Sequence, residues 1–385
     1  MKKVYFDNAA TTKPREEVIN CITEVLKTEY GNPSSTHSYG RSSKSLLETA
    51  RKEIAKALHV AASEIIFTSG GTEADNLILI SSVRDLGVKR IISSRIEHHA
   101  VLHTLEWLKS EYKIEVDFVN LDECGFVDFH DLEKLLADST EKTLVSLMHV
   151  NNEVGNVLDL KDVALLCKKY NALFHSDTVQ SVGHFELDFS EIPLDFATAA
   201  AHKFHGPKGA GFAFVRKNSG LRAIIHGGEQ ERGLRAGTEA VYAIAGMAEA
   251  LKISTQNIEK ERSYITELKE YFKLRLAENF PSVKFNGGCA DGSKSTYTLL
   301  NVCLPISAEK AMLLLFQLDL KGIACSKGSA CQSGAEGGSH VLNELLTEED
   351  LQKPSIRFSF SIFNTKDEVD YVVEVLKEFV PQAVV

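Results

Sequence analysis

The stretch AAAHKFHGPKGAG, residues 199–211, contains a lysine whose surroundings suit covalent chemistry. Lys203 follows three alanines and a histidine, and a glycine-rich turn with a second lysine, Lys208, comes directly after it. Two interpretations fit this pattern. Lys203 is either a nucleophilic amine at the end of a buried strand, or one of two counter-charges beside a loop that cradles phosphate. A P-loop needs the spacing GxxxxGK[ST], which HGPKGAG lacks.

A carboxylate stands at the end of the preceding apolar run. In ALFHSDTVQS the run ends at Asp177, Gln180 follows it, and Lys203 ends the next such run. An acid and an amine at one sheet edge suit pyridoxal 5'-phosphate, because lysine forms the Schiff base and the acid keeps the pyridine nitrogen protonated. Taken singly, Asp177 could cap a turn, Gln180 could lie at the surface, and Lys203 could extend into solvent. The combination favours the cofactor site.

A seat for the cofactor phosphate is predicted in EIIFTSGGTEADNLILI. A strand is followed there by Gly70, Gly71 and Thr72, and then by the start of a helix. Backbone N–H groups and the helix dipole at such a start favour an anion, and glycines let the chain approach closely. Turns of this kind are common, so the prediction depends on the acid and the amine found elsewhere in the chain.

These groups need a scaffold, and the hydrophobic pattern predicts one of the α/β class. Amphipathic helices alternate with short apolar runs, which implies a mostly parallel central sheet covered on both faces. Ligands in such folds bind at the carboxyl ends of strands. We expect a large cofactor-binding domain over residues 13–256 and a smaller α+β domain over residues 257–385. Residues 1–12 are expected to join the smaller domain.

Bulk composition narrows the function classes. The 385-residue chain has a net charge of −10, which opposes general binding to nucleic acid or to anionic membranes. The start MKKVYFDNAATT lacks the apolar core of a signal peptide, and the seven cysteines are scattered. We therefore expect a cytoplasmic protein without nucleic-acid or membrane partners.

The chain resembles the cysteine desulfurases of the NifS/IscS-like, long-loop group. These are fold-type I pyridoxal-phosphate enzymes of the class V aminotransferase superfamily. The matching stretches occur in the family's order from residue 5 to residue 361. They are YFDNAATT, GNPSSTHSYGR, FTSGGTEADN, EHHAVL, MHVNNEVG, HSDTVQSVG, AHKFHGPKGAG, GGEQERGLRAGT, CSKGSAC and SIRFSFS.

The resemblance implies roles around the cofactor ring. Lys203 corresponds to the Schiff-base lysine and Asp177 to the partner of the pyridine nitrogen. Gln180 and Asn152 would contact the side of the ring that carries the hydroxyl, and Asn152 would also contact the substrate. His98 would stack on the ring and shuttle protons.

The resemblance also implies a phosphate site and a substrate site. Gly71, Thr72 and His202 would hold the phosphate, and Thr238 would reach in from the second subunit of a homodimer. Arg357 would bind the substrate carboxylate, for which a bidentate guanidinium is well shaped.

His98 stands in EHHAVLH, which offers a second interpretation. His99 and His103 are four residues apart, a spacing seen at helical metal sites. A third ligand at convincing spacing is missing from the sequence, so we predict no metal and a surface or core-edge role for both residues.

The segment CSKGSACQSGAEGGSH places Cys331 in a stretch rich in glycine and serine. By itself Cys331 could be an idle cysteine or could pair with Cys325, although their spacing fits no common motif. The resemblance favours a nucleophile, because a desulfurase needs a thiolate that reaches the substrate sulfur and then carries a persulfide outward.

The function implied is removal of sulfur from L-cysteine, giving L-alanine and a persulfide on Cys331. The sulfur would pass to an acceptor protein, such as an iron–sulfur scaffold, or serve thiolation. Another class V enzyme, a selenocysteine lyase or an aminotransferase, is the alternative. The non-enzymatic alternative is a cofactor-binding protein that has lost catalytic turnover.

One position departs from the family pattern. The family has a serine three residues before the Schiff-base lysine, where it donates to the phosphate, and this chain has Ala200. The loss of a hydrogen bond to a charged group typically costs about 1.5–3 kcal/mol. The cofactor affinity, not the identity of the cofactor, is therefore expected to suffer unless Thr72, His202 and Thr238 replace the lost hydrogen bond.

Overall fold

The computed structural model describes residues 2–138, 140–306, 313–328 and 338–379. Within them the largest sheet has seven strands: β2 (Ile65–Thr68), β3 (Arg90–Ser93), β4 (Glu115–Phe118), β5 (Thr143–Ser146), β6 (Leu173–Asp177), β7 (Phe196–Ala200) and β8 (Gly211–Val215). Their order is β2-β8-β7-β6-β5-β3-β4. All neighbours are parallel except β8, which is antiparallel to both β2 and β7. The predicted mostly parallel sheet is confirmed.

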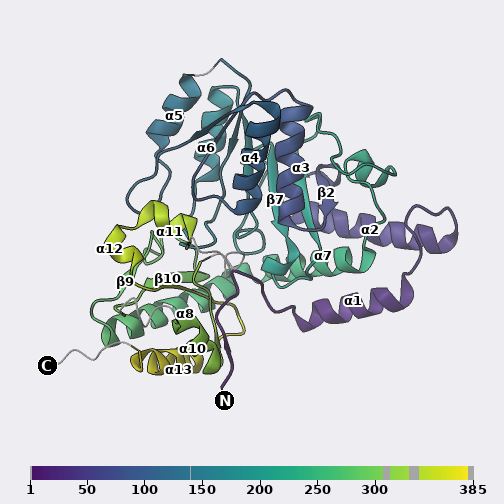
Figure 1. The fold of residues 1–385 in the computed structure, drawn as a ribbon. Coiled ribbons are helices and arrows are strands. Elements are labelled where there is room, and N and C mark those ends of the chain that lie inside the picture. The colour runs from purple at the N-terminus through teal and green to yellow at the C-terminus, as the bar shows by residue number, and fades with distance from the viewer. Residues whose placement is uncertain (1, 139, 307–312, 329–337, 380–385) are drawn as a thin grey trace.

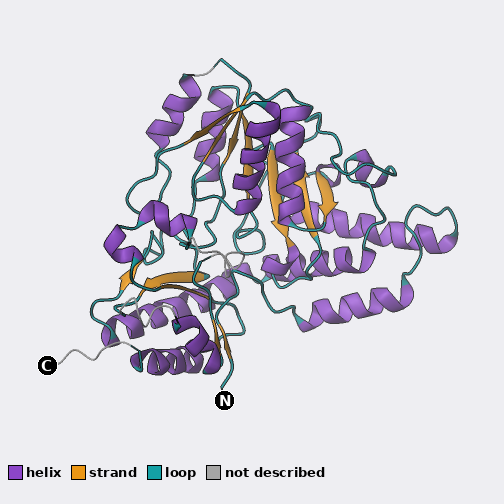
Figure 2. Ribbon diagram, in the orientation of Figure 1, coloured by secondary structure: helices purple, strands orange, loops and turns teal. Residues whose placement is uncertain are grey.

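Helices cover both faces of this sheet (Figure 2). One face packs against α2 (Ser38–Ala57), α5 (Phe129–Ala137), α6 (Leu160–Lys169) and α7 (Val241–Gln256), and α1 (Glu16–Thr28) packs on α7. The other face packs against α3 (Gly71–Arg84) and α4 (His99–Tyr112). Side chains alternate between faces along a strand, so Phe67 joins the first core and Ile66 the second. The α/β class is thereby confirmed.

A smaller unit is built from the C-terminal part of the chain (Figure 1). Its strands are β9 (Lys284–Phe285), β10 (Leu299–Cys303), β11 (Ile323–Ala324) and β12 (Ser355–Ser359). Its helices are α8 (Ile258–Asn279), α10 (Leu314–Leu320), α11 (His340–Leu345), α12 (Glu348–Leu351) and α13 (Lys366–Lys377). Strands β12, β10 and β9 form an antiparallel sheet in that order.

The N-terminal segment lies against this smaller unit (Figure 1). Strand β1 (Val4–Tyr5) pairs in parallel with β11, and Phe6 packs in the aromatic core beside Phe358. A few residues later, the Thr12 N–H donates to the His202 carbonyl over 2.8 Å, beyond the end of β7. The segment therefore links the smaller unit to the edge of the large sheet. The exact domain boundaries remain a prediction.

Among the described residues, no helix is both long and apolar enough to cross a membrane.

Candidate active site

The ends of three strands meet at one edge of the large sheet. β6 and β7 are parallel neighbours with Asp177 opposite Thr198, so both end at this edge. Strand β2 runs in the direction of β7, because each is antiparallel to β8. Lys203 closes a short 3-10 turn, Ala201–Lys203, directly after β7. The topology therefore brings the acid, the amine and the start of α3 together.

A cavity of about 220 Å³ opens at this edge. Nine of the residues predicted for the site line it: Gly71, Thr72, His98, Asn152, Asp177, Gln180, His202, Lys203 and Arg357. Thr238 is exposed and does not line it, in keeping with the expectation that this residue serves a second subunit, which stays a prediction. Cys331 lies outside the described residues.

The N-terminal segment forms part of the cavity wall and receives the lysine. Lys203 Nζ donates to the Ala9 carbonyl over 2.6 Å and to the Ala10 carbonyl over 3.0 Å. Gln180 Nε2 donates to the same Ala9 carbonyl over 2.9 Å. Both side chains are thus aimed by main-chain oxygens that lie 171 to 194 residues away in sequence. Such preorganisation suits a group that must act in a fixed geometry.

Asp177 is buried at the end of β6. Its Oδ1 accepts the Val179 N–H over 2.9 Å and lies 3.5 Å from the Thr198 hydroxyl. Burial raises the pKa of this carboxyl to about 6, with a smaller contribution from Asp75 and an opposing one from His98. A buried carboxylate of this kind is stabilised by a cation, and a protonated pyridine nitrogen is such a cation.

Two further buried acids lie close by, and neither was predicted. Asp75 lines the cavity with its Oδ1 3.4 Å from His175 Nε2, and burial raises its pKa to about 7. Glu97 is also buried, and desolvation raises its pKa to about 8, helped by Asp177 and Asp75. Nothing local in the sequence singles out either acid, since polar or charged residues flank both. A carboxyl with a raised pKa binds protons more readily than usual, so both groups favour their protonated, uncharged form beside Asp177.

The cavity histidines are neutral at physiological pH. His98 caps α4, where its Nδ1 accepts the Ala100 N–H over 3.1 Å, so the neutral ring carries its proton on Nε2. Burial lowers the pKa of His98. Burial, with Lys203 and Lys208 nearby, lowers the pKa of His202 to about 4. Both rings therefore stack or hydrogen-bond as uncharged groups.

The alternative metal site at His99 and His103 has the geometry of a packed pair. The two rings stack with their centroids 4.6 Å apart, and His340 packs on His99 at 4.4 Å. Metal ligands instead point their nitrogens at a common centre. Within the described ranges, no group of three or more His, Cys, Asp or Glu side chains could hold a metal ion.

The start of α3 has the features of an anion seat. Gly71 and Thr72 are its first residues, and among the described residues no side chain caps it at Gly70. A Cβ on Gly71 would lie 2.6 Å from Val179 Cγ2, so only glycine permits this close packing. Gly71 and Thr72 line the cavity, and the first N–H groups of a helix have no intrahelical partner, so this helix start suits an anionic phosphate.

Ala200 ends β7 beside this seat, and serine at this position is expected to tighten cofactor binding. Ala200 lines the cavity, and its Cβ is 3.9 Å from the position that a Cβ on Gly71 would take. A hydroxyl there would add a hydrogen bond to a charged phosphate, about 1.5–3 kcal/mol or roughly ten- to a hundredfold in Kd. The check is a titration of cofactor-free Ala200→Ser with pyridoxal phosphate. An unchanged or weaker affinity would contradict it.

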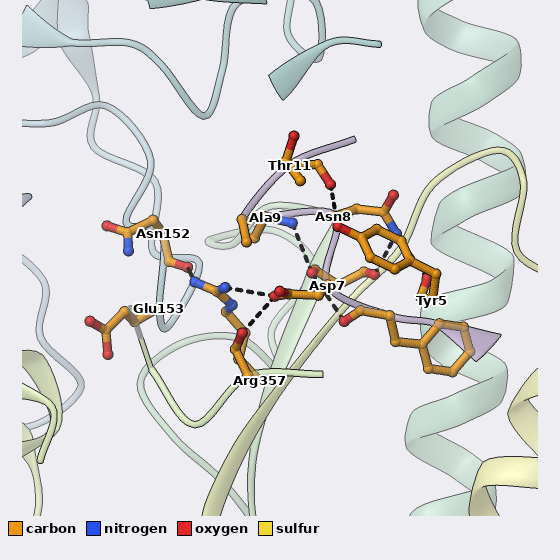
Figure 3. Close-up of polar contacts among 12 residues, drawn as sticks. Tyr5, Asp7, Asn8, Ala9, Thr11, Asn152, Glu153 and Arg357 are labelled. Atoms are coloured by element: carbon orange, nitrogen blue, oxygen red, sulfur yellow. Dashed lines mark hydrogen bonds and ion pairs between the residues drawn. The ribbon is translucent and has the colours of Figure 1, made fainter. Parts of the chain in front are cut away.

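Arg357 forms a wall of the cavity from β12 (Figure 3). Its side chain is 1% exposed. Nη1 donates to the Asn152 carbonyl over 2.7 Å, and Nη2 donates to Asp7 Oδ1 over 3.0 Å. A buried guanidinium held in this way offers a fixed cation to a carboxylate ligand.

Most of the other cysteines are poor candidates for a thiolate. Burial raises the pKa of the thiols of Cys21, Cys167, Cys289, Cys303 and Cys325. Cys325 was the predicted alternative partner of Cys331, and its raised pKa argues against redox chemistry there. Cys124 is exposed but does not line the cavity.

Comparison with known proteins identifies relatives along the whole chain. Residues 4–372 match the family described as aminotransferase class-V. Cysteine desulfurase IscS of Dictyoglomus turgidum is 38% identical over 381 residues, which cover 98% of this chain and 95% of that protein. Putative cysteine desulfurase IscS 1 of Bacillus subtilis is also 38% identical, covering 98% and 99%.

Solved structures agree with these sequence matches. A NifS-like protein superposes with a TM-score of 0.89 at 34% identity, covering 98% of this chain and 99% of that one. SspA in complex with cysteine superposes with a TM-score of 0.81 at 27% identity, covering 94% of this chain and all of the other. The resemblance inferred from the motifs is confirmed.

Proposed function

This chain belongs to the aminotransferase class-V family, and on that premise we propose that it is a cysteine desulfurase acting on L-cysteine. The observation that carries the proposal is that Lys203, Asp177 and Arg357 line one and the same cavity. The Lys203 amine suits a cofactor aldehyde, and the buried Asp177 suits a pyridine nitrogen. The buried Arg357 guanidinium suits the carboxylate of an amino acid.

Pyridoxal 5'-phosphate is the cofactor of this enzyme family, and the residues present fit it. Lys203 would attach it, Asp177 would pair with its ring nitrogen, and the start of α3 with His202 would hold its phosphate. His98 would stack on its ring, with Gln180 and Asn152 toward the ring hydroxyl. When bound, the cofactor supplies an electron sink for a substrate attached through its amino group.

The chain's own groups would move the proton and the sulfur. Lys203 Nζ, aimed by two main-chain carbonyls, would take the substrate α-proton. Arg357 would orient the substrate through its carboxylate. The Cys331 thiolate would attack the substrate sulfur, forming an S–S bond as the C–S bond breaks. The electron pair of the broken bond stays with the substrate β-carbon, which is then protonated, and return of a proton to the α-carbon gives alanine.

A second copy of the chain and a sulfur acceptor complete the proposal. Large apolar side chains are exposed on α1, α2 and the loop between them, notably Leu26, Tyr30 and Tyr39, and the rings of Tyr30 and Tyr39 lie 5.3 Å apart. Such a patch favours self-association, and a homodimer would let Thr238 of one copy reach the phosphate site of the other.

The acceptor of the sulfur would be a protein such as an iron–sulfur scaffold. The cytoplasm is the proposed compartment.

The experiment that tests this function is a product assay with purified, cofactor-loaded protein and L-cysteine. A desulfurase forms alanine with a thiol acceptor present and needs no 2-oxo acid. An aminotransferase would form its products only after a 2-oxo acid is added. A selenocysteine lyase would act on selenocysteine and leave cysteine almost untouched. Alanine formation without a 2-oxo acid supports the proposal, and either of the other two patterns contradicts it.

A further inference from the structure

The carboxylate of Asp7 accepts a hydrogen bond from Arg357 (Figure 3), and Arg357 lines the cavity. We propose that Asp7 is a positioning residue, which holds the Arg357 guanidinium in the orientation that receives the substrate carboxylate. This inference rests on the proposed function, because it takes the carboxylate of L-cysteine as the ligand of Arg357.

Arg357 has little freedom when Asp7 is in place. Its side chain is 1% exposed, and the Asp7 side chain is 19% exposed. One hydrogen bond runs from Nη2 to Asp7 Oδ1 and another from Nη1 to the Asn152 carbonyl. Because the guanidinium is a planar fork, two contacts on different nitrogens fix both its position and its plane.

The same contacts leave donors for a ligand. A guanidinium has five N–H groups, and these two bonds use two of them. Arg357 Nε is buried and has no hydrogen-bond partner among the described residues. A buried donor without a partner is costly, and a bound carboxylate would remove that cost.

Asp7 is itself held from two sides. Its Oδ1 also accepts the Ser326 hydroxyl over 2.7 Å, and its main chain forms a parallel bridge with Ser359 on β12. Its carbonyl accepts the Ala10 N–H over 3.0 Å. That turn presents the Ala9 and Ala10 carbonyls to the lysine amine. Asp7 therefore orients the Arg357 guanidinium with its side chain. Its main chain holds the turn that directs the Ala9 and Ala10 carbonyls toward the Lys203 amine.

The test compares KM and kcat for L-cysteine in Asp7→Ala, Asp7→Asn and the native holoenzyme. Loss of one charge-assisted hydrogen bond predicts a KM about tenfold or more higher in Asp7→Ala, with kcat within about threefold. Asparagine keeps an oxygen that can accept from both Arg357 and Ser326. Asp7→Asn should therefore restore KM to within about threefold of native. An unchanged KM in Asp7→Ala, or no rescue by asparagine, would overturn the proposal.

A double variant separates positioning from a general structural effect. In the Arg357→Gln background, Asp7→Ala should raise KM no further, because the group it positions is gone. An equal, additive effect in both backgrounds would overturn the inference. If Arg357→Gln alone leaves KM unchanged, the proposed role of Arg357 fails, and this inference fails with it. If Arg357→Gln raises KM and Asp7→Ala does not, the inference alone is wrong.

The chain offers a matched control at Asp370. Its Oδ1 accepts from Arg275 Nε over 2.9 Å and from the Tyr271 hydroxyl over 2.8 Å. These are again a guanidinium and a hydroxyl, but they join α8 to α13 at a partly exposed place that does not line the cavity. Asp370→Ala should leave KM within about twofold of native, as surface ion pairs contribute little. Should Asp7→Ala fail to fold, Asp7→Glu takes its place. Its carboxylate is displaced by one methylene, and an unchanged KM in that variant would overturn the proposal.

Discussion

Replacement of Lys203 by alanine or arginine is expected to abolish alanine formation from L-cysteine. The loss should be a factor on the order of 10⁴ or more, because the variants lack both the amine that attaches the cofactor and the group that takes the substrate proton. Arginine retains a cation next to the Ala9 and Ala10 carbonyls, so it tests charge separately from the reactive amine. The measurement is alanine released per hour by proteins incubated with excess pyridoxal phosphate.

Lys208 provides the control for this prediction. It is the exposed second lysine of the same glycine-rich stretch, and it does not line the cavity. Lys208→Ala should keep activity within about twofold, as expected for an exposed side chain. If Lys203→Arg retained substantial turnover, Lys203 would be a counter-charge beside a phosphate, the alternative that the sequence left open.

Asp177→Asn is expected to weaken cofactor binding by about a hundredfold or more at neutral pH. The native carboxylate is buried, and the loss of one partner of a buried ion pair typically costs about 3–5 kcal/mol. Pyridoxamine 5'-phosphate is the appropriate probe, because it has the same ring and phosphate but cannot attach to Lys203. Its Kd is measured for cofactor-free native and variant protein.

The pH dependence gives this prediction a second readout. The pKa of Asp177 is about 6, so the native carboxyl becomes protonated as the pH falls below that value and loses its attraction for a pyridinium. At pH values below about 6, the cofactor affinity of the native protein should therefore decrease relative to that of Asp177→Asn. Titration of the phosphate affects both proteins alike, so the ratio of the two Kd values reports the pairing of Asp177 with the ring nitrogen. A ratio independent of pH would contradict the assignment.

Much of the fold could be predicted because its signals are local. The apolar runs that end at Asp177 and near Lys203 became the parallel neighbours β6 and β7, and the helix expected after Gly70 is α3. Strand β4 was not predicted, because Glu115–Phe118 alternates charge with apolar residues and lies at the sheet edge. There, pairing with β3 decides the conformation more than composition does.

The site was harder to predict where contacts join distant parts of the chain. The motifs predicted residue types, but nothing local shows that the carbonyls of Ala9 and Ala10 receive the Lys203 amine. The pairing of Asp7 with Arg357 likewise depends on how the N-terminal segment lies against β12. Main-chain groups leave no trace in residue identity, so a sequence pattern cannot single them out.

Desulfurase chemistry at Cys331 is decided by the intact mass of cofactor-loaded protein after treatment with L-cysteine in the absence of reductant. Native protein should gain the mass of one or more sulfur atoms, with peptide mapping placing them on Cys331, while alanine appears. Cys331→Ala should gain no sulfur. Cys124→Ala, which removes an exposed cysteine outside the cavity, should behave like native protein. Alanine formed with no sulfur on Cys331, or sulfur gained equally by Cys331→Ala, would contradict the account.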